Sequence, residues 1–311
     1  MLRLGLRRRT LELLGRGETS QAPTLVRPPS ELPIPEPDEV DAQHAAGLSE
    51  LVGLEIDVES ALAFAHHVVL PRIDEFRDQF PIVGSGDPFH LVNGSFMAGD
   101  AHVYYAVLRE LRPGRVVEVG AGRSTQVAIA AIAANRAEGH DATLTAIDPS
   151  PPAYLASAID ERDQLLVAKV QDVDIALLTG LERGDVLFID SSHLVRIGGD
   201  VLYQLCEVVP RLKPGVCVHF HDISLPKPYP RTYFEQGLYW AEQYALQTFL
   251  AFNRKFEIVW PATYLMVHRR EFMEETFPEL QAMRAAFPLS EPSSFWIRVR
   301  HEDCEDSTAP V

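Results

Sequence analysis

The amino-acid sequence predicts an α/β fold in which a mostly parallel sheet is covered by helices on both faces. From about residue 95 onward, short apolar runs alternate with segments of helical periodicity, which is typical of strand–helix–strand units. The runs are apolar throughout instead of alternating with polar residues, as expected for parallel strands buried on both faces. The spacing gives seven strands, and we expect the last to pair antiparallel with the sixth.

The first of these units begins at Asp100, a suitable N-cap for a helix that ends at Leu111 before a Pro-Gly pair. Residues 116–119 form the first predicted strand and residues 124–135 the helix after it. The turn between them contains two glycines, so that one strand–turn–helix unit carries the sequence VVEVGAGRST.

The remaining elements follow in the same order. Strands two to five are predicted over 144–147, 165–170, 186–189 and 216–220. After them we predict a helix over 239–252, strand six over 256–260, a mostly helical segment over 262–286 and strand seven over 294–298. Strands two to five each end at polar or acidic residues. The carboxyl ends of parallel strands share one edge of a sheet, where open α/β sheets bind their ligands.

Composition divides the chain into four parts. Residues 1–48 combine a basic amphipathic start with six prolines between 18 and 39, and they are predicted to be a tail and an extended linker. Apolar periodicity over 49–94 predicts a helical cap. The main domain covers 95–301, and the acidic residues 302–311 are predicted to be disordered.

Charge and cysteine usage limit the classes of partner. The net charge of −16 disfavours binding to nucleic acid, because a polyanion would be repelled. No apolar run approaches the ~20 residues that span a bilayer. The cysteines show no CxxC spacing, and we expect Cys206 and Cys217 to be buried in a reducing compartment, the cytoplasm. A small-molecule partner is therefore expected, and homo-oligomerisation stays open.

The turn after strand one has the features of a ligand-binding loop. Gly120 and Gly122 allow a tight turn and a close backbone approach to a ligand, and Ser124 opens the next helix beside it. Glu118 lies two residues before the first glycine, where its carboxylate suits a cationic amino group and not a pyrophosphate. A dinucleotide-binding loop would also carry a third glycine, which is missing here.

Two further strand ends suit a nucleoside. Asp148 ends strand two, where an acidic side chain can accept hydrogen bonds from both ribose hydroxyls; alone it is equally suited to forming a turn before Pro149. Gln171 and Asp172 follow strand three, where a polar side chain can reach an adenine amino group. A purely structural role for this pair stays open.

The ends of strands four and five suggest metal or acid–base chemistry. Asp190 and His193 belong to the run DSSH, and His221 and Asp222 to the run HFHD. Asp190, His221 and Asp222 form a predicted ligand set for a divalent cation such as Mg²⁺ or Mn²⁺. His193 is then the predicted general base. In the alternative, Asp190 binds the cofactor or substrate and both histidines are structural.

The segment after strand five, residues 223–240, is rich in proline and aromatic residues and is predicted to be a lid or a substrate wall. Its candidate contacts to a substrate are Lys227, Tyr229, Arg231 and Tyr233. His219, inside strand five, is predicted to be a packed core residue.

With these pieces the chain resembles the bacterial class I S-adenosylmethionine-dependent methyltransferases grouped as methyltransferase family 24, near relatives of the metal-dependent macrolide-sugar O-methyltransferases. The resemblance covers roughly 95–300 and is carried by GDAHVYYAVLRELRP, VVEVGAGRST, AIDPSP, DVLFIDSSH, GVCVHFHDI and YWAEQYALQTFLAFN. It implies a Rossmann-like fold of seven strands. The glycine loop and Glu118 would hold the methionine end of S-adenosylmethionine, and Asp148 the ribose.

For the metal-dependent relatives, the resemblance implies that Asp190 binds the metal and that His193 is the base. The strand-five acidic pair of those relatives is His221-Asp222 here, and a histidine ligand also suits manganese, iron or zinc. The sequence therefore predicts O-methylation of a hydroxyl on a sugar or another secondary metabolite. The alternatives are an NAD- or nucleotide-binding Rossmann enzyme and a non-catalytic protein of the same fold.

Overall fold

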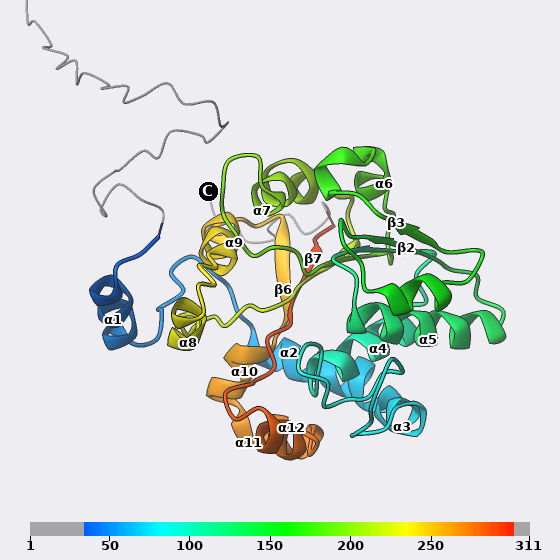
Figure 1. Ribbon diagram of the computed structural model, residues 1–311, viewed down its shortest axis with the longest axis horizontal. Coiled ribbons are helices and arrows are strands. Elements are labelled where there is room, and N and C mark those ends of the chain that lie inside the picture. Colours follow the sequence, from blue (N-terminus) through cyan, green and yellow to red (C-terminus); the bar gives the residue numbers. More distant parts are fainter. Residues whose placement is uncertain (1–33, 302–311) are drawn as a thin grey trace, which may run out of the picture.

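The computed structural model describes residues 34–301. The basic N-terminal segment, most of the predicted linker and the acidic C-terminal segment lie outside the described residues. At the centre is a seven-stranded sheet in the order β3-β2-β1-β4-β5-β7-β6, with helices on both of its faces (Figure 1). The predicted fold class is confirmed.

The sheet is mostly parallel. β1 to β5 pair parallel with one another, and β7 pairs antiparallel with both β5 and β6, as predicted for the last strand. The strand predicted over 165–170 is shorter, because the chain leaves the sheet at Leu166. The strands are β1 (Arg115–Val119), β2 (Thr143–Ile147), β3 (Gln164–Leu166), β4 (Val186–Ile189), β5 (Cys217–Phe220), β6 (Phe256–Pro261) and β7 (Phe295–Val299).

Helices precede or connect the strands in the predicted positions. The helix predicted from Asp100 and the one after the glycine turn are both present, and the 262–286 segment is helical in three short pieces. The N-cap prediction was wrong by one residue, because Gly99 is the N-cap and Asp100 is already helical, with its carboxylate turned to the Ser293 and Ser294 amides. The helices of the main domain are α4 (Asp100–Leu111), α5 (Arg123–Ala137), α6 (Ile175–Thr179), α7 (Asp200–Tyr203), α8 (Arg231–Glu235), α9 (Glu242–Leu250), α10 (Ala262–His268), α11 (Arg270–Thr276) and α12 (Leu280–Ala286).

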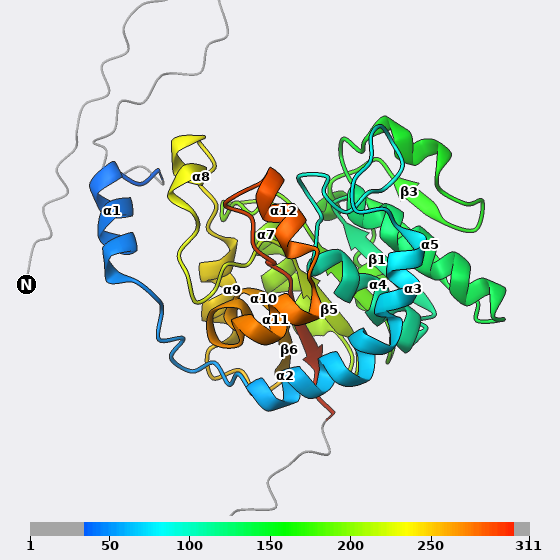
Figure 2. The same cartoon turned by 90° about the horizontal axis from the view of Figure 1, so that it is seen from below.

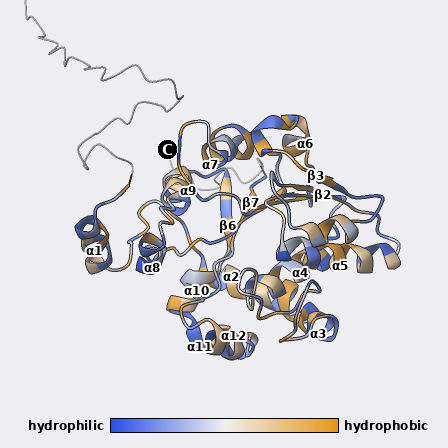
Figure 3. Cartoon of the chain, in the orientation of Figure 1, coloured by the Kyte–Doolittle hydropathy of each residue, from blue (hydrophilic) through white to orange (hydrophobic). Residues whose placement is uncertain are grey.

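Successive residues of each strand supply two separate cores. Val116 and Phe188 pack with α4, α5 and the C-terminal helices, whereas their neighbours Val117 and Leu187 pack with residues of α6, α7 and α9. Side chains alternate between the faces of a strand, so a strand that is apolar throughout needs helices on both sides. The strands and the inward sides of these helices are accordingly hydrophobic in Figure 3.

The region before the main domain is helical, as predicted for the cap. One continuous helical segment consists of α2 (Val58–Phe64), a π-helical turn (Ala65–Val69) and α3 (Leu70–Gln79). Its π-helical turn and α3 pack against α4. The end of the predicted linker differs, because α1 (Pro37–Ala46) is a helix that begins at a proline in the first helical position. α1 buries no side chain and lies beside α8 (Figures 1 and 2).

The cysteine prediction is half right. Cys217 is buried in β5, but Cys206 is exposed, because the helical turn that carries it points this side chain away from the sheet. His219 is fully buried and stacks on Phe188 at 4.1 Å between ring centroids, which confirms it as a core residue. Among the described helices, none is long and apolar enough to cross a membrane.

Candidate active site

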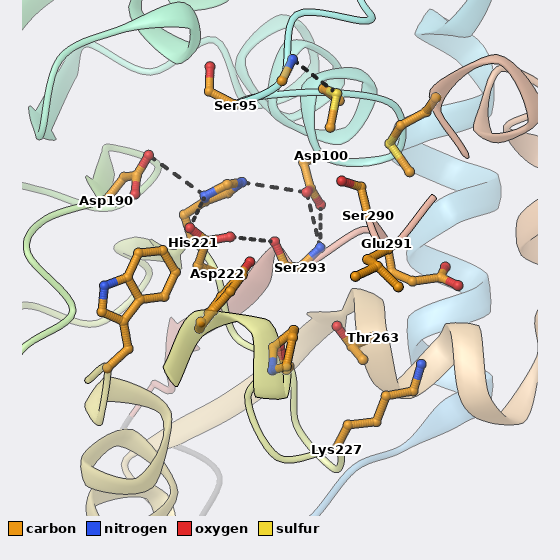
Figure 4. Close-up of a pocket in the computed structure, with 18 of the residues that line it drawn as sticks. Ser95, Asp100, Asp190, His221, Asp222, Lys227, Thr263, Ser290, Glu291 and Ser293 are labelled. Atoms are coloured by element: carbon orange, nitrogen blue, oxygen red, sulfur yellow. Dashed lines mark hydrogen bonds and ion pairs between the residues drawn. The ribbon is translucent and has the colours of Figure 1, made fainter. Parts of the chain in front are cut away.

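Two cavities lie at the carboxyl ends of the strands, where the chain order reverses between β1 and β4. Ligands of open α/β sheets bind at this switch point. A cavity of about 320 Å³ follows β1, β2 and β4 and is lined by Gly120, Asp148 and Gln171 among others. A cavity of about 370 Å³ follows β4 and β5 (Figure 4). Asp190 lines both, so the two cavities meet at its side chain.

The glycine turn brings the ends of β1 and β4 together. Gly120 has φ +89°, and a Cβ atom on it would lie 1.7 Å from the carbonyl oxygen of Asp190. Only glycine fits this approach. The turn is further held by Asp148, whose carboxylate accepts a hydrogen bond of 2.9 Å from the Ala121 amide. The first cavity therefore has a rigid floor built from the turn after β1 and the end of β2.

Glu118, the residue before Val119 in β1, is fully buried and is not among the residues that line this cavity. Among the described residues, none makes a hydrogen bond to either of its carboxylate oxygens. Burial raises the pKa of Glu118 to about 8, an effect that the nearby hydroxyls of Thr125 and Ser124 only partly offset. A buried carboxylate without a partner is costly, and a cationic group brought next to it would relieve that cost.

The other residues predicted for this side are not all at the cavity. Gly122 and Ser124 lie at the start of α5, where the Gly122 amide donates to the Thr125 hydroxyl. Gln171 lines the cavity, and its side-chain amide donates to the Gly198 carbonyl at 3.0 Å. Asp172 is exposed and is not among the lining residues.

His193 is not among the residues that line the second cavity, but it contacts three that do, Asp190, Asp222 and Trp240. Its imidazole is held on both ring nitrogens. Its Nδ1 lies 2.7 Å from a carboxylate oxygen of Glu242, at the start of α9. Its Nε2 lies 3.3 Å from Asp190 and 3.5 Å from Asp222. The His193 carbonyl in turn accepts the Glu242 amide at 3.2 Å, which fixes the start of α9 against the DSSH turn. One imidazole therefore joins three carboxylates.

His221 forms a second bridge behind the first. Its Nδ1 lies 3.7 Å from Asp190 and 3.6 Å from Asp222, and its Nε2 lies 3.5 Å from Asp100. Asp100 also accepts the backbone amides of Ser293 and Ser294 at 2.9 to 3.1 Å. Figure 4 shows His221 between Asp190 and Asp100, with Asp222 below it.

The charges of this cluster are strongly coupled. Burial would lower the pKa of His193, but its contacts with Asp190 and Glu242 outweigh burial and raise that pKa to about 10. The same competition raises the pKa of His221 well above its usual range, here chiefly through the charge of Asp222. The charge of His221 in turn holds the pKa of Asp190 well below its usual value, against the effect of burial.

Asp190, His193 and Asp222 are suited to binding a metal ion. One ligand atom from each lies within 4.8 Å of the other two. Two carboxylates and an imidazole are a donor set that suits Mg²⁺, Mn²⁺ or another first-row divalent cation. The ligand set predicted from the sequence has His221 in place of His193. Because both imidazoles approach both carboxylates, that assignment stays a prediction.

Backbone geometry helps to orient the His193 and Asp222 side chains. His193 and Asp222 both have positive φ, +57° and +56°, so each occupies a left-handed turn directly after a strand. Such strained conformations cluster at functional sites. Sequence reasoning did not assign Glu242 or Asp100 to the site. Glu242 falls in the EQYALQTFL segment, but only the folded chain shows that its helix starts against His193.

The wall over 223–240 lies beside this cluster as predicted. The ring of Trp240 packs on His193 at 4.2 Å between centroids, and Tyr233 packs edge-on against Trp240 at 4.7 Å. Lys227 and Tyr233 line the second cavity. Tyr229 is buried, and Arg231 pairs with Asp41 and Glu235 outside the cavity lining.

Comparison with known proteins gives one family match and several distant structural likenesses. Residues 117–223 match the family model of a methyltransferase domain. No curated protein matches the chain. A CmcI structure with SAH is 13% identical, with 75% of this chain and 92% of that one covered and a TM-score of 0.32. A CmcI structure with Mg and SAM is 15% identical, with 65% and 71% covered and a TM-score of 0.30. A putative methyltransferase from Thermobifida fusca YX is 14% identical, with 65% and 82% covered and a TM-score of 0.35. At these TM-scores the structural likenesses support no inference about this chain.

Proposed function

Because the chain carries a class I S-adenosylmethionine-dependent methyltransferase domain, we propose that it transfers the methyl group to a hydroxyl oxygen of a small acceptor, a sugar or another secondary metabolite. One observation carries the proposal. Asp190 lines both the first cavity, hereafter the cofactor cavity, and the second, hereafter the acceptor cavity, and it lies 3.3 Å from the Nε2 of His193, an imidazole whose Nδ1 is held by the buried carboxylate of Glu242.

His193 acts as the general base in this proposal. Glu242 accepts a hydrogen bond from the Nδ1–H group of the neutral imidazole. In this tautomer the lone pair is on Nε2, which can take the proton of the acceptor hydroxyl. A base of this kind contributes typically ~10²–10⁴-fold to the rate. The ring of Trp240 packs on this imidazole at 4.2 Å between centroids.

The acidic pair Asp190 and Asp222 would hold a divalent cation. Without one, the pKa of about 10 keeps His193 protonated near neutral pH and unable to accept a proton. When bound, a divalent cation would cancel the charge of these carboxylates and lower the pKa of an acceptor hydroxyl. His221 lies between this pair and Asp100. It is the proposed third ligand of the cation, or else it lies beside the residue that is.

The cofactor cavity binds the methyl donor in this proposal. Asp148 binds the ribose hydroxyls, and Gln171 lies where the adenine amino group is expected. With its pKa raised to about 8, Glu118 would ionise against the ammonium of the methionine end and so bind it. Since the sulfonium already activates the methyl group, the remaining task is alignment of two bound molecules, which contributes up to ~7–11 kcal/mol.

The test is methyl transfer from labelled S-adenosylmethionine to hydroxylated acceptors before and after metal removal. Exhaustive chelation and dialysis should lower activity at least about tenfold, and added MgCl₂ or MnCl₂ should restore it. Binding of S-adenosylhomocysteine, measured by calorimetry on the same metal-free sample, should persist. Full activity after chelation would contradict the proposal that a cation takes part. A labelled methyl group found on nitrogen or carbon of the product would contradict transfer to oxygen.

A further inference from the structure

The acceptor cavity contains one lysine, Lys227, in the segment between β5 and α8. Figure 4 shows it across the cavity from Asp190, on the side of Thr263 and Glu291. Its position therefore corresponds to the end of a bound acceptor that is remote from the reacting hydroxyl.

The backbone around Lys227 is held rigidly. Its amide donates to the Ser224 carbonyl at 2.8 Å. The fully buried Gln243 spans the same turn, since its side-chain oxygen accepts the Ser224 amide at 2.9 Å and its side-chain nitrogen donates to the Lys227 carbonyl at 3.1 Å. A lysine on a loop fastened at both ends from the core is presented to the cavity with little freedom in its backbone.

The carboxylates that line the same cavity are already paired. Asp190 and Asp222 contact the two histidines, and Asp100 accepts three hydrogen bonds from backbone amides. Glu291 is paired with Arg284 at 2.9 Å and lies 3.8 Å from Arg270. None of them forms an ion pair with the ammonium of Lys227.

The Lys227 ammonium has no hydrogen bond or ion pair to any residue over 34–301, although the side chain is only partly exposed. A cation in a binding cavity that the protein leaves without a partner is suited to an anionic ligand group. We infer that the acceptor carries an anionic group, a carboxylate or a phosphate, and that Lys227 binds this group while the acceptor hydroxyl lies near Asp190, the lining residue that His193 contacts. The inference rests on the proposed function, whose substrate class it narrows.

The size of the cavity limits the rest of the acceptor. A volume of about 370 Å³, at ~30 Å³ for each water-sized unit, encloses roughly a dozen non-hydrogen atoms. Trp240 and Tyr233 supply flat apolar walls on which one ring can lie. The enclosed part of the acceptor is therefore about one hydroxylated ring with an acidic substituent.

The test compares acceptors that differ only in charge. Labelled methyl transfer is measured with glucuronate, glucose 6-phosphate and glucuronamide, and with 3,4-dihydroxybenzoate and its amide. We expect the anionic members to exceed the amides in kcat/KM. Lys227→Gln should lower kcat/KM for the anionic members by about 10- to 100-fold, mainly through KM, and leave the amides unchanged. The carboxylate and phosphate arms identify which anion is preferred.

Two control variants define the result. Lys227→Arg should retain most of the preference, and Lys213→Gln, at a lysine paired with Glu182 away from the cavity, should leave all values unchanged. A preference for anions that persists in Lys227→Gln assigns the anion to another group and overturns the inference. Equal or better turnover of the amides overturns it as well, while the proposed function stands. If no member of the panel is methylated, the proposed function is contradicted and the inference falls with it.

Discussion

The cofactor cavity and the acceptor cavity share Asp190 but are built in different ways. The cofactor cavity is formed largely by the few residues that follow β1, β2 and β4. The acceptor cavity draws on segments far apart in the chain, from Gly94 to Ser293. Changes on the cofactor side should therefore act on S-adenosylmethionine binding, and changes on the acceptor side on turnover with binding intact.

The strongest test of this division is His193→Ala. Removing the proposed base should lower kcat by about 10²–10⁴-fold, because it takes away the imidazole that Glu242 orients. The affinity for S-adenosylhomocysteine, measured by calorimetry, should stay within about twofold of the wild-type value. Unchanged turnover would remove His193 from the mechanism. A parallel loss of cofactor binding would remove the division between the cavities.

Gly120→Ala should affect the cofactor cavity and the acceptor cavity together, because Gly120 lies against Asp190, the residue that lines both. Its Cβ would lie 1.7 Å from the Asp190 carbonyl oxygen at a φ of +89°. We expect the free energy of unfolding to fall by about 2–4 kcal/mol, with loss of both cofactor binding and activity. Chemical denaturation measures the first effect.

Gly122→Ala is the matched control for stability. A Cβ on Gly122 would meet no atom within 4 Å, and its backbone is extended. The free energy of unfolding should therefore change by less than about 1 kcal/mol. Equal losses in the two variants would mean that the contact between Gly120 and Asp190 does not hold the ends of β1 and β4 together.

The same difference explains how much could be predicted from the sequence. Glycines and acidic residues directly after apolar runs identify the cofactor side, because strand ends that are adjacent in a parallel sheet must meet at one edge. Asp148 is an example, since it is both the end of β2 and a residue of the cavity. The length of β3 could not be predicted, because an edge strand with one neighbour ends wherever its loop packs better.

The acceptor side could be predicted only in part. The runs DSSH and HFHD indicate that Asp190 and Asp222 meet, but nothing local indicates that α9 begins against the DSSH turn and brings Glu242 to His193. Asp100 was predicted as a helix cap, and its contact with His221 depends on the packing of α4 against the segment before β7. Such contacts are tertiary, and periodicity does not encode them.

Glu242→Ala sharpens the comparison with a residue that contacts neither ligand. Loss of the carboxylate leaves His193 Nδ1 without its 2.7 Å partner, so the imidazole is no longer held in one tautomer. We expect kcat to fall by about 10- to 100-fold, with KM for S-adenosylmethionine unchanged. Glu242→Gln keeps an acceptor for the Nδ1 proton and should recover part of the loss. Equal loss in both variants would indicate a structural defect, which thermal unfolding measures directly.

The smallest effect is expected for Glu118→Gln, on the cofactor side. The folded-state pKa of about 8 is raised from an ordinary value near 4.5 by burial. The contribution to stability is therefore fully present below about pH 4.5 and is lost as the pH rises through about 8. In the protein without cofactor, the variant should lose less stability than the wild type between pH 5 and 8. Its affinity for S-adenosylhomocysteine at pH 8 should fall about tenfold, because an amide cannot neutralise the ammonium of the methionine end. If the free energy of unfolding changed with pH in the same way for both proteins, Glu118 would be ionised at no energetic cost. The buried acid proposed to bind the ammonium of the donor would then have no unusual pKa.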